Sequence, residues 1–165
     1  MTIVYVETSA LVKRYVQEVG SDVIDELFEH QLRIGIFTMS ILGALELKSA
    51  LARLQRGGRI TEPEMFRLLA QFRSDRNLFS VVLPVDNSLM DEAGDSLSDH
   101  ALRTLDAIHF ASTLRLKTLA GSINEEIVVV TSDRELVSAW DEEGFASINP
   151  EDDEALEYVQ GLLTG

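Results

Sequence analysis

The chain has 165 residues, 45% of them hydrophobic and 25% charged, which is typical of one folded globular domain and excludes disorder for most of its length. It has no cysteine, so disulfides and thiolate metal sites are excluded. The net charge of −14 is unfavourable for phosphate binding, but nine of the 28 acids follow Arg134, beyond which no Lys or Arg stands, and we interpret this acidic end as a solvated face.

Apolar runs rich in β-branched residues alternate with segments of helical periodicity along the chain. In chain order they predict a strand over 3–6, helices over 10–16 and 21–28, a strand over 34–38, helices over 40–56 and 61–72, a strand over 79–85, helices over 87–97 and 102–119, a strand over 127–131, a helix over 133–142 and a strand over 144–148.

Polar residues before these helices predict where each helix begins, because a short side chain can accept a hydrogen bond from the first free amides. The expected caps are a hydroxyl in the Glu7–Ser9 segment, Ser21, Ser40, Thr61 with Pro63 in the first turn, and the pair Ser132–Asp133.

Strands alternating with helices predict an α/β fold with a central, mainly parallel sheet and helices on both faces. We expect one domain over 1–148 and an acidic tail over 149–165 that forms a short helix. The sequence has no apolar N-terminal run with a basic flank and no run of about 20 apolar residues, so we expect no signal peptide, no membrane span and a cytoplasmic location.

Four acids are candidates for a functional site in such a fold. Glu7 follows the first predicted strand and Asp133 follows the 127–131 strand, and the carboxyl ends of neighbouring parallel strands lie together. Glu46 and Asp106 lie inside predicted helices among apolar residues, where a carboxylate is costly without a partner or a cation.

Each acid taken alone has a simpler explanation. Glu7 and Asp133 would complement the dipoles of the helices that they precede, and Glu46 and Asp106 would form salt bridges with arginines such as Arg53 or Arg103. The coincidence of all four favours a shared site. Carboxylates that converge repel one another unless a hard divalent cation neutralises them, and Mg²⁺ and Mn²⁺ prefer such oxygen ligands. A water activated at that cation can attack a phosphodiester.

Four segments in order resemble the PIN-domain family, and most of all its VapC-type toxins, the ribonuclease halves of VapBC toxin–antitoxin pairs. They are residues 3–13 (IVYVETSALVK), 44–51 (ALELKSAL), 105–109 (LDAIH) and 130–136 (VTSDREL), within a resemblance that spans residues 2 to about 148. The resemblance implies a PIN-like fold, a homodimer, an antitoxin partner and an RNA-cutting Mg²⁺ or Mn²⁺ site. It assigns the catalytic and metal-binding roles to Glu7, Glu46, Asp106 and Asp133, with support from Thr8, Ser9 and Ser132.

One residue departs from the family's pattern, whose first acid is normally aspartate and is here Glu7. The extra methylene shifts the carboxylate by more than about an ångström, which Mg²⁺ tolerates poorly. We therefore expect reduced activity that Glu7→Asp raises. The alternative is an attenuated PIN-like module that binds RNA or a protein without cutting. A phospho-acceptor receiver domain is disfavoured because no suitable lysine follows a later strand.

Other residues carry weaker signals. Lys13, Arg53, Arg56 and Arg59 are candidates for binding RNA phosphate, although the arginines also suit a solvated helix end. His109 lies one turn beyond Asp106, and we favour a packed, hydrogen-bonded core residue over a general base as its role. A stripe of Met65, Phe66, Leu69 and Phe72 is expected in the core, or under a dimer or antitoxin contact.

Overall fold

The computed structural model describes residues 2–164 and has a five-stranded, fully parallel sheet at its centre, in the order β3-β2-β1-β4-β5. Its strands are β1 (Thr2–Val6), β2 (Gly35–Ser40), β3 (Val81–Leu83), β4 (Ile127–Val130) and β5 (Ala146–Ile148). β1 and β4 lie inside the sheet, which explains why their residues form near-continuous apolar runs. The predicted α/β class is confirmed.

Helices fill the connections between the strands. They are α1 (Thr8–Val12), α2 (Ser21–Glu29), α3 (Gln31–Ile34), α4 (Ile41–Arg56), α5 (Glu62–Asp75), a 3-10 turn η1 (Arg76–Leu78), α6 (Asn87–Asp99), α7 (Thr104–Ser122), α8 (Arg134–Glu142) and α9 (Ala155–Leu162). Within the described part of the chain, no helix is both long and apolar enough to cross a bilayer.

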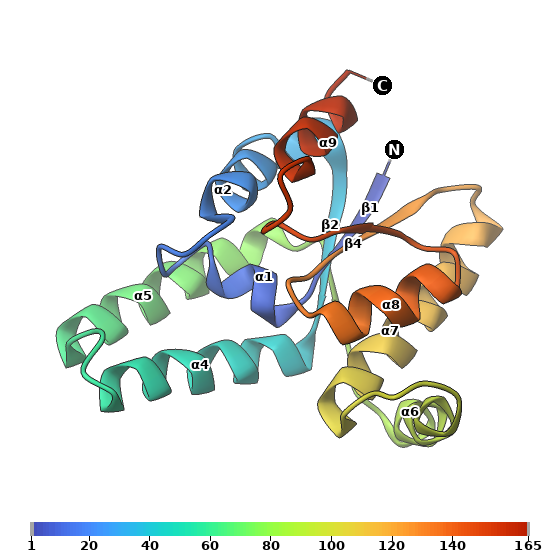
Figure 1. Cartoon of the computed structure of the whole chain (residues 1–165), viewed down its shortest axis with the longest axis horizontal. Helices are drawn as coiled ribbons and strands as arrows, with labels where there is room; N and C mark the ends of the chain where they lie inside the picture. The colour runs from blue at the N-terminus through green and yellow to red at the C-terminus, as the bar shows by residue number, and fades with distance from the viewer. Residues whose placement is uncertain (1, 165) are drawn as a thin grey trace.

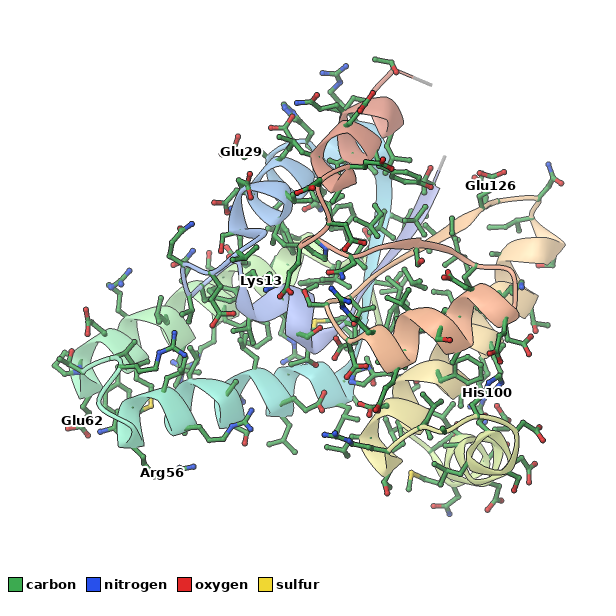
Figure 2. The ribbon with its side chains drawn as sticks, viewed as in Figure 1. Lys13, Glu29, Arg56, Glu62, His100 and Glu126 are labelled. Carbon is green, nitrogen blue, oxygen red and sulfur yellow. The ribbon has the colours of Figure 1, made fainter. Side chains whose placement is uncertain are left out.

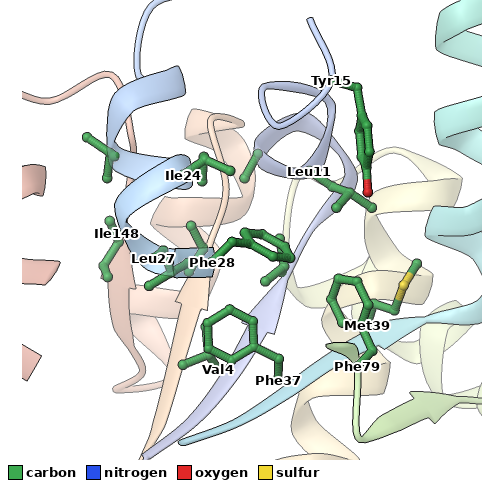
Figure 3. Close-up of a cluster of buried hydrophobic side chains, with 14 of the residues drawn as sticks. Val4, Leu11, Tyr15, Ile24, Leu27, Phe28, Phe37, Met39, Phe79 and Ile148 are labelled. Atoms are coloured by element: carbon green, nitrogen blue, oxygen red, sulfur yellow. The ribbon is translucent and has the colours of Figure 1, made fainter. Parts of the chain in front are cut away.

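The two faces of the sheet carry separate cores, because successive strand residues point to opposite sides. Val4 and Val6 of β1 pack into one core with α1, α2, α4, α5 and α9, whereas Ile3 and Tyr5 pack into the other with α7 and α8. Figure 1 shows these two helix groups on opposite sides of the strands, and Figure 3 shows the first core around Phe28 and Phe37. The expected helices on both faces are thus present.

The predicted apolar stripe on α5 is only partly in the core. Phe72 is buried, Met65 and Leu69 are partly buried against the first core, and Phe66 is 56% exposed.

Three predicted caps are confirmed: Ser40 caps α4, Thr61 caps α5 in a capping box with Glu64, and Asp133 caps α8. Two predictions were wrong. The carboxylate of Glu7, and not a hydroxyl, caps α1, and Gly20 precedes α2 with a φ of 83°. The Ser21 hydroxyl instead donates to the Lys13 carbonyl and accepts from the Glu18 amide, which ties down the turn between the two helices.

Some predicted boundaries also differ. α1 ends at Val12, and residues 13–16 form turns, so the apolar positions after Val12 belong to the loop that Ser21 holds. β3 spans only Val81–Leu83, because Pro84 has no amide to donate. The short α3 and η1 were not predicted.

The segment after β5 packs onto the body of the protein. Ala155 and Val159 of α9 are buried in the first core, where α9 contacts α2. The division of the chain at residue 148 stays a prediction.

We predict that Gly20→Ala destabilises the protein more than Gly58→Ala. Both glycines have left-handed backbones, with φ of 83° and 72°, where alanine costs about 1–2 kcal/mol. A Cβ at Gly20 would also overlap the Pro150 carbonyl, whereas a Cβ at Gly58 meets nothing within 4 Å. Urea unfolding of both variants measures the difference in the free energy of unfolding. Equal losses would show that the Gly20–Pro150 approach does not constrain the fold.

Candidate active site

The predicted acids meet at the carboxyl end of the sheet. Glu7 directly follows β1, Asp133 begins α8 after β4, Glu46 lies in the second turn of α4, and Asp106 lies in the first turn of α7. Oxygen atoms of Glu7 and Glu46 and a ring nitrogen of His109 all lie within 4.8 Å of one another. Asp106 is close enough to Asp133 and Glu7 that their charges raise its pKa. Among the described residues, the fold therefore gathers Glu7, Glu46 and His109 into one group, and Asp106 and Asp133 lie outside it.

Glu7 is held through one of its two carboxylate oxygens. Its side chain is almost fully buried, and Oε2 accepts hydrogen bonds from the Ser9 amide at 2.8 Å, the Ser9 hydroxyl at 2.5 Å and the Thr131 hydroxyl at 2.8 Å. The two hydroxyls in turn accept from the backbone amides of Ser132 and Asp133. The loop between β4 and α8 is thereby fixed to the carboxylate that caps α1.

Glu46 is held in the same manner. Its Oε2 accepts from the Thr8 hydroxyl and from His109 Nε2, both at 2.7 Å. Gly43, one turn earlier on α4, makes this approach possible, since a Cβ there would lie 3.2 Å from Thr8 Oγ1. The expected salt bridge to Arg53 is not what holds Glu46, although the positive charge of Arg53 contributes to its environment.

A buried chain of hydrogen bonds runs from Tyr5 through His109 to Glu46. The Tyr5 hydroxyl lies 2.6 Å from His109 Nδ1, and burial raises the pKa of Tyr5, so the hydroxyl keeps a proton that it can donate to Nδ1. In its neutral form the imidazole then carries its proton on Nε2, and in either protonation state it donates from Nε2 to Glu46. His109 is thus the packed, hydrogen-bonded core residue that the sequence predicted, and the same ring orients a site carboxylate.

The pKa values of the site follow from these contacts. Burial raises the pKa of Glu46, but the hydrogen bonds from His109 and Thr8, with the charges of His109 and Arg53, outweigh it and leave that pKa lowered. Burial lowers the pKa of His109, but Glu46, Glu7 and Asp106 together raise it. The pKa of Asp106 is raised, first by burial and then by repulsion from Asp133 and Glu7.

The remaining oxygens suit a hard divalent cation. Among residues 2–164, Oε1 of Glu7 and Oε1 of Glu46 accept no hydrogen bond, although Oε2 of each accepts two or more. Two glutamate oxygens with Asp106 and Asp133 nearby form the donor set that Mg²⁺ and Mn²⁺ prefer. The proton on Nε2 commits His109 to Glu46, so we assign it an orienting role rather than a place among the ligands.

The supporting and RNA-binding candidates divide into several groups. Thr8 and Ser9 donate to the two glutamates, whereas the Ser132 hydroxyl is buried without a partner among the described residues. Lys13 is buried and pairs with Glu151 at 2.7 Å. Arg53, Arg56 and Arg59 are exposed on or just after α4.

The sequence pattern did not predict the roles of Thr131 and Tyr5. Thr131 carried one signal, a hydroxyl directly after a buried strand. Tyr5 carried none, because within β1 it has the pattern of a core residue and its partner His109 is 104 positions away.

Comparison with known proteins decides the family. The PIN domain family matches residues 4–141. The chain belongs to the PIN-domain family. It is 30% identical over 147 residues to Ribonuclease VapC35 of Mycobacterium tuberculosis, in strains CDC 1551 / Oshkosh and ATCC 25618 / H37Rv, covering 89% of this chain and 96% of the relative. The resemblance seen in the four sequence segments is confirmed.

A solved structure supports the same fold. The crystal structure of PAE2754 from Pyrobaculum aerophilum matches with a TM-score of 0.63 and 21% identity, covering 99% of this chain and 91% of that one. At this identity the likeness concerns the fold alone.

The electrostatics of this PIN-domain site lead to a prediction about stability. The pKa of Asp106 is raised in the folded state, so ionising this carboxyl costs folding stability. The cost builds up as the pH rises from the unfolded-state pKa to the folded-state pKa, and it is fully present at pH 7. Asp106→Asn removes that charge and should raise the melting temperature at pH 7 by about 2 °C, a modest gain because water screens the half-exposed group. The gain should vanish below about pH 3, where both states of the wild type are protonated.

Thermal melts at both pH values in EDTA test this, with Asp91→Asn as the control, because Asp91 is an exposed acid on α6 outside the site. A loss of stability at pH 7, or an equal gain from Asp91→Asn, would contradict the repulsion inferred here.

Proposed function

We propose that this protein is a metal-dependent endoribonuclease that hydrolyses RNA phosphodiesters at the Glu7–Glu46–Asp106–Asp133 cluster. The observation that supports it most is the pair of glutamates that share one arrangement: in each, Oε2 is occupied by protein donors and Oε1 is left for a cation. The similarity to Ribonuclease VapC35 over 89% of the chain supports the choice of RNA as substrate.

The chain's own residues have defined roles in this reaction. Thr8 and His109 orient Glu46, and Ser9 and Thr131 orient Glu7, so the oxygens are in place before a cation arrives. Mg²⁺ or Mn²⁺ bound there would neutralise the cluster, activate a water and stabilise charge on the phosphoryl group. Asp106 and Asp133 complete the negative field that attracts the cation.

The biological setting is part of the proposal. We infer that the protein is the toxin of a toxin–antitoxin pair, that a small antitoxin controls it, that it works as a homodimer and that it acts in the cytoplasm. These inferences rest on its membership of the PIN-domain family and on the VapC-type relative.

A cleavage assay tests the activity. Purified protein, freed of any partner, is incubated with total cellular RNA in Mg²⁺, Mn²⁺ or EDTA, beside Asp106→Asn. We expect cleavage with either metal, none in EDTA, and activity at least about 100-fold lower in Asp106→Asn, because the cation then has one ligand fewer. Folded wild-type protein that cuts no RNA with either metal would contradict the proposal and favour the non-cleaving module.

The same assay with Glu7→Asp tests whether the longer acid limits activity. We expect this variant to cut faster than wild type, because a shorter carboxylate restores the geometry of the family. Glu46→Asp, which shortens the neighbouring acid, should cut more slowly. No gain in Glu7→Asp would show that the hydrogen bonds around Glu7 already compensate for its length.

A further inference from the structure

A basic cleft opens beside the acid cluster. It has a volume of about 370 Å³, and its walls include Ser9, Lys13, Arg53, Arg59, Ser132 and Glu151. Ser9 is also the residue whose hydroxyl donates to Glu7, so the cleft begins at the carboxylates. Three cationic side chains and two acids, Glu18 and Glu151, line the cleft, which leaves an excess of one positive charge in a chain of net charge −14.

The charges in this cleft are only partly neutralised. Lys13 pairs with Glu151 at 2.7 Å and with Glu18 at 3.9 Å, and Arg59 lies 3.8 Å from Glu18. Arg53 forms no ion pair with any described residue, but its charge reaches the site, where it contributes to the lowered pKa of Glu46. The cleft therefore presents Arg53 as an uncompensated cation next to the carboxylates.

A second observation points to a ligand that accepts hydrogen bonds. The Ser132 hydroxyl is buried at the wall of the cleft and has no partner among residues 2–164. A buried hydroxyl without a partner is costly, and an acceptor that enters the cleft would relieve that cost. A phosphate oxygen can accept from the guanidinium of Arg53, and from this hydroxyl once Ser132 adopts a rotamer that points into the cleft.

We propose that this cleft binds a phosphate of single-stranded RNA next to the scissile bond, held by Arg53, Arg59 and the Ser132 hydroxyl. The inference rests on the proposed function, since it names how the substrate of that site is held. Lys13, already paired with Glu151, contributes less. Continuity with the acid cluster favours RNA over an acidic peptide, because the strand must pass the carboxylates in order to be cut.

Arg56 provides a matched control on the same helix. It is exposed like Arg53 and carries the same charge, but it does not line the cleft. Figure 2 shows Arg56 at the far end of α4, directed away from the side on which Lys13 lies.

The experiment measures binding of a fluorescent single-stranded RNA by anisotropy, in the Asp106→Asn background so that binding is separated from cleavage. We expect the added pair Arg53→Gln and Arg59→Gln to raise Kd at least fivefold at low salt. The slope of log K against log salt should become shallower by about 0.7 for each RNA phosphate that the variant no longer neutralises. Adding Arg56→Gln instead should change Kd less than about twofold. Ser132→Ala should weaken binding without changing the salt slope.

Each outcome separates this inference from the proposed activity. The inference that the cleft binds RNA would be overturned if the Arg53→Gln/Arg59→Gln pair and Arg56→Gln weakened binding equally, or if neither weakened it. This holds even if the wild type cuts RNA. The expected pattern in a protein that never cuts would support the cleft and contradict the nuclease. No RNA binding by any variant would overturn the inference directly.

Discussion

Two glutamate carboxylates placed side by side at the end of a sheet repel each other, and the rest of the site depends on how this repulsion is managed. The protein directs hydroxyl, amide and imidazole donors to one oxygen of each carboxylate. Hydrogen bonds to an ionised group are among the stronger ones in proteins, so they hold both side chains in one orientation. The opposite oxygens accept no hydrogen bond from the described residues, and under the proposed function a cation would bind there.

This arrangement links the site to the fold. Thr131 directly follows β4, Tyr5 lies in β1 and Ser9 lies in α1, so these residues belong to, or directly follow, elements that the two cores hold together. Through Ser9 and Thr131, the amides that begin α8 are connected to the carboxylate that caps α1. Hydrogen bonds therefore orient both glutamates without any ligand, which is what a cation with strict geometry requires. The pKa of Asp106 stays raised, because a backbone hydrogen bond at Arg103 and the charge of His109 do not outweigh its burial and its repulsion from Asp133 and Glu7.

The sequence was sufficient to predict the framework, and it identified the acids as candidates. Apolar runs at β1 and β4 predicted buried parallel strands, and the rule that strand ends gather chemistry located Glu7 and Asp133. Glu46 and Asp106 were conspicuous as carboxylates on apolar helices. Tyr5 and Thr131 were not predicted, because a hydroxyl in or after a strand has no sequence signal for a partner more than 100 positions away.

The same limit applies to the basic residues. Lys13, Arg53, Arg56 and Arg59 look alike in the sequence, yet the structure buries the first against Glu151, places two others along a cleft and leaves Arg56 outside it. Which of these basic side chains pairs with an acid depends on the path of the segment after β5, which brings Glu151 to Lys13. No local sequence pattern encodes that path.

The measurement that tests the central claim most directly is calorimetric titration of Mn²⁺ into the wild type and Thr131→Val. Thr131 orients Glu7 without belonging to the four acids, so we expect the variant to bind Mn²⁺ about 10-fold or more weakly. Thr113→Val is the control, since this equally buried threonine accepts from Trp140 and forms no hydrogen bond to the carboxylates. Equal Mn²⁺ affinity in the wild type and in folded Thr131→Val would contradict the claim that hydroxyl donors prepare the site.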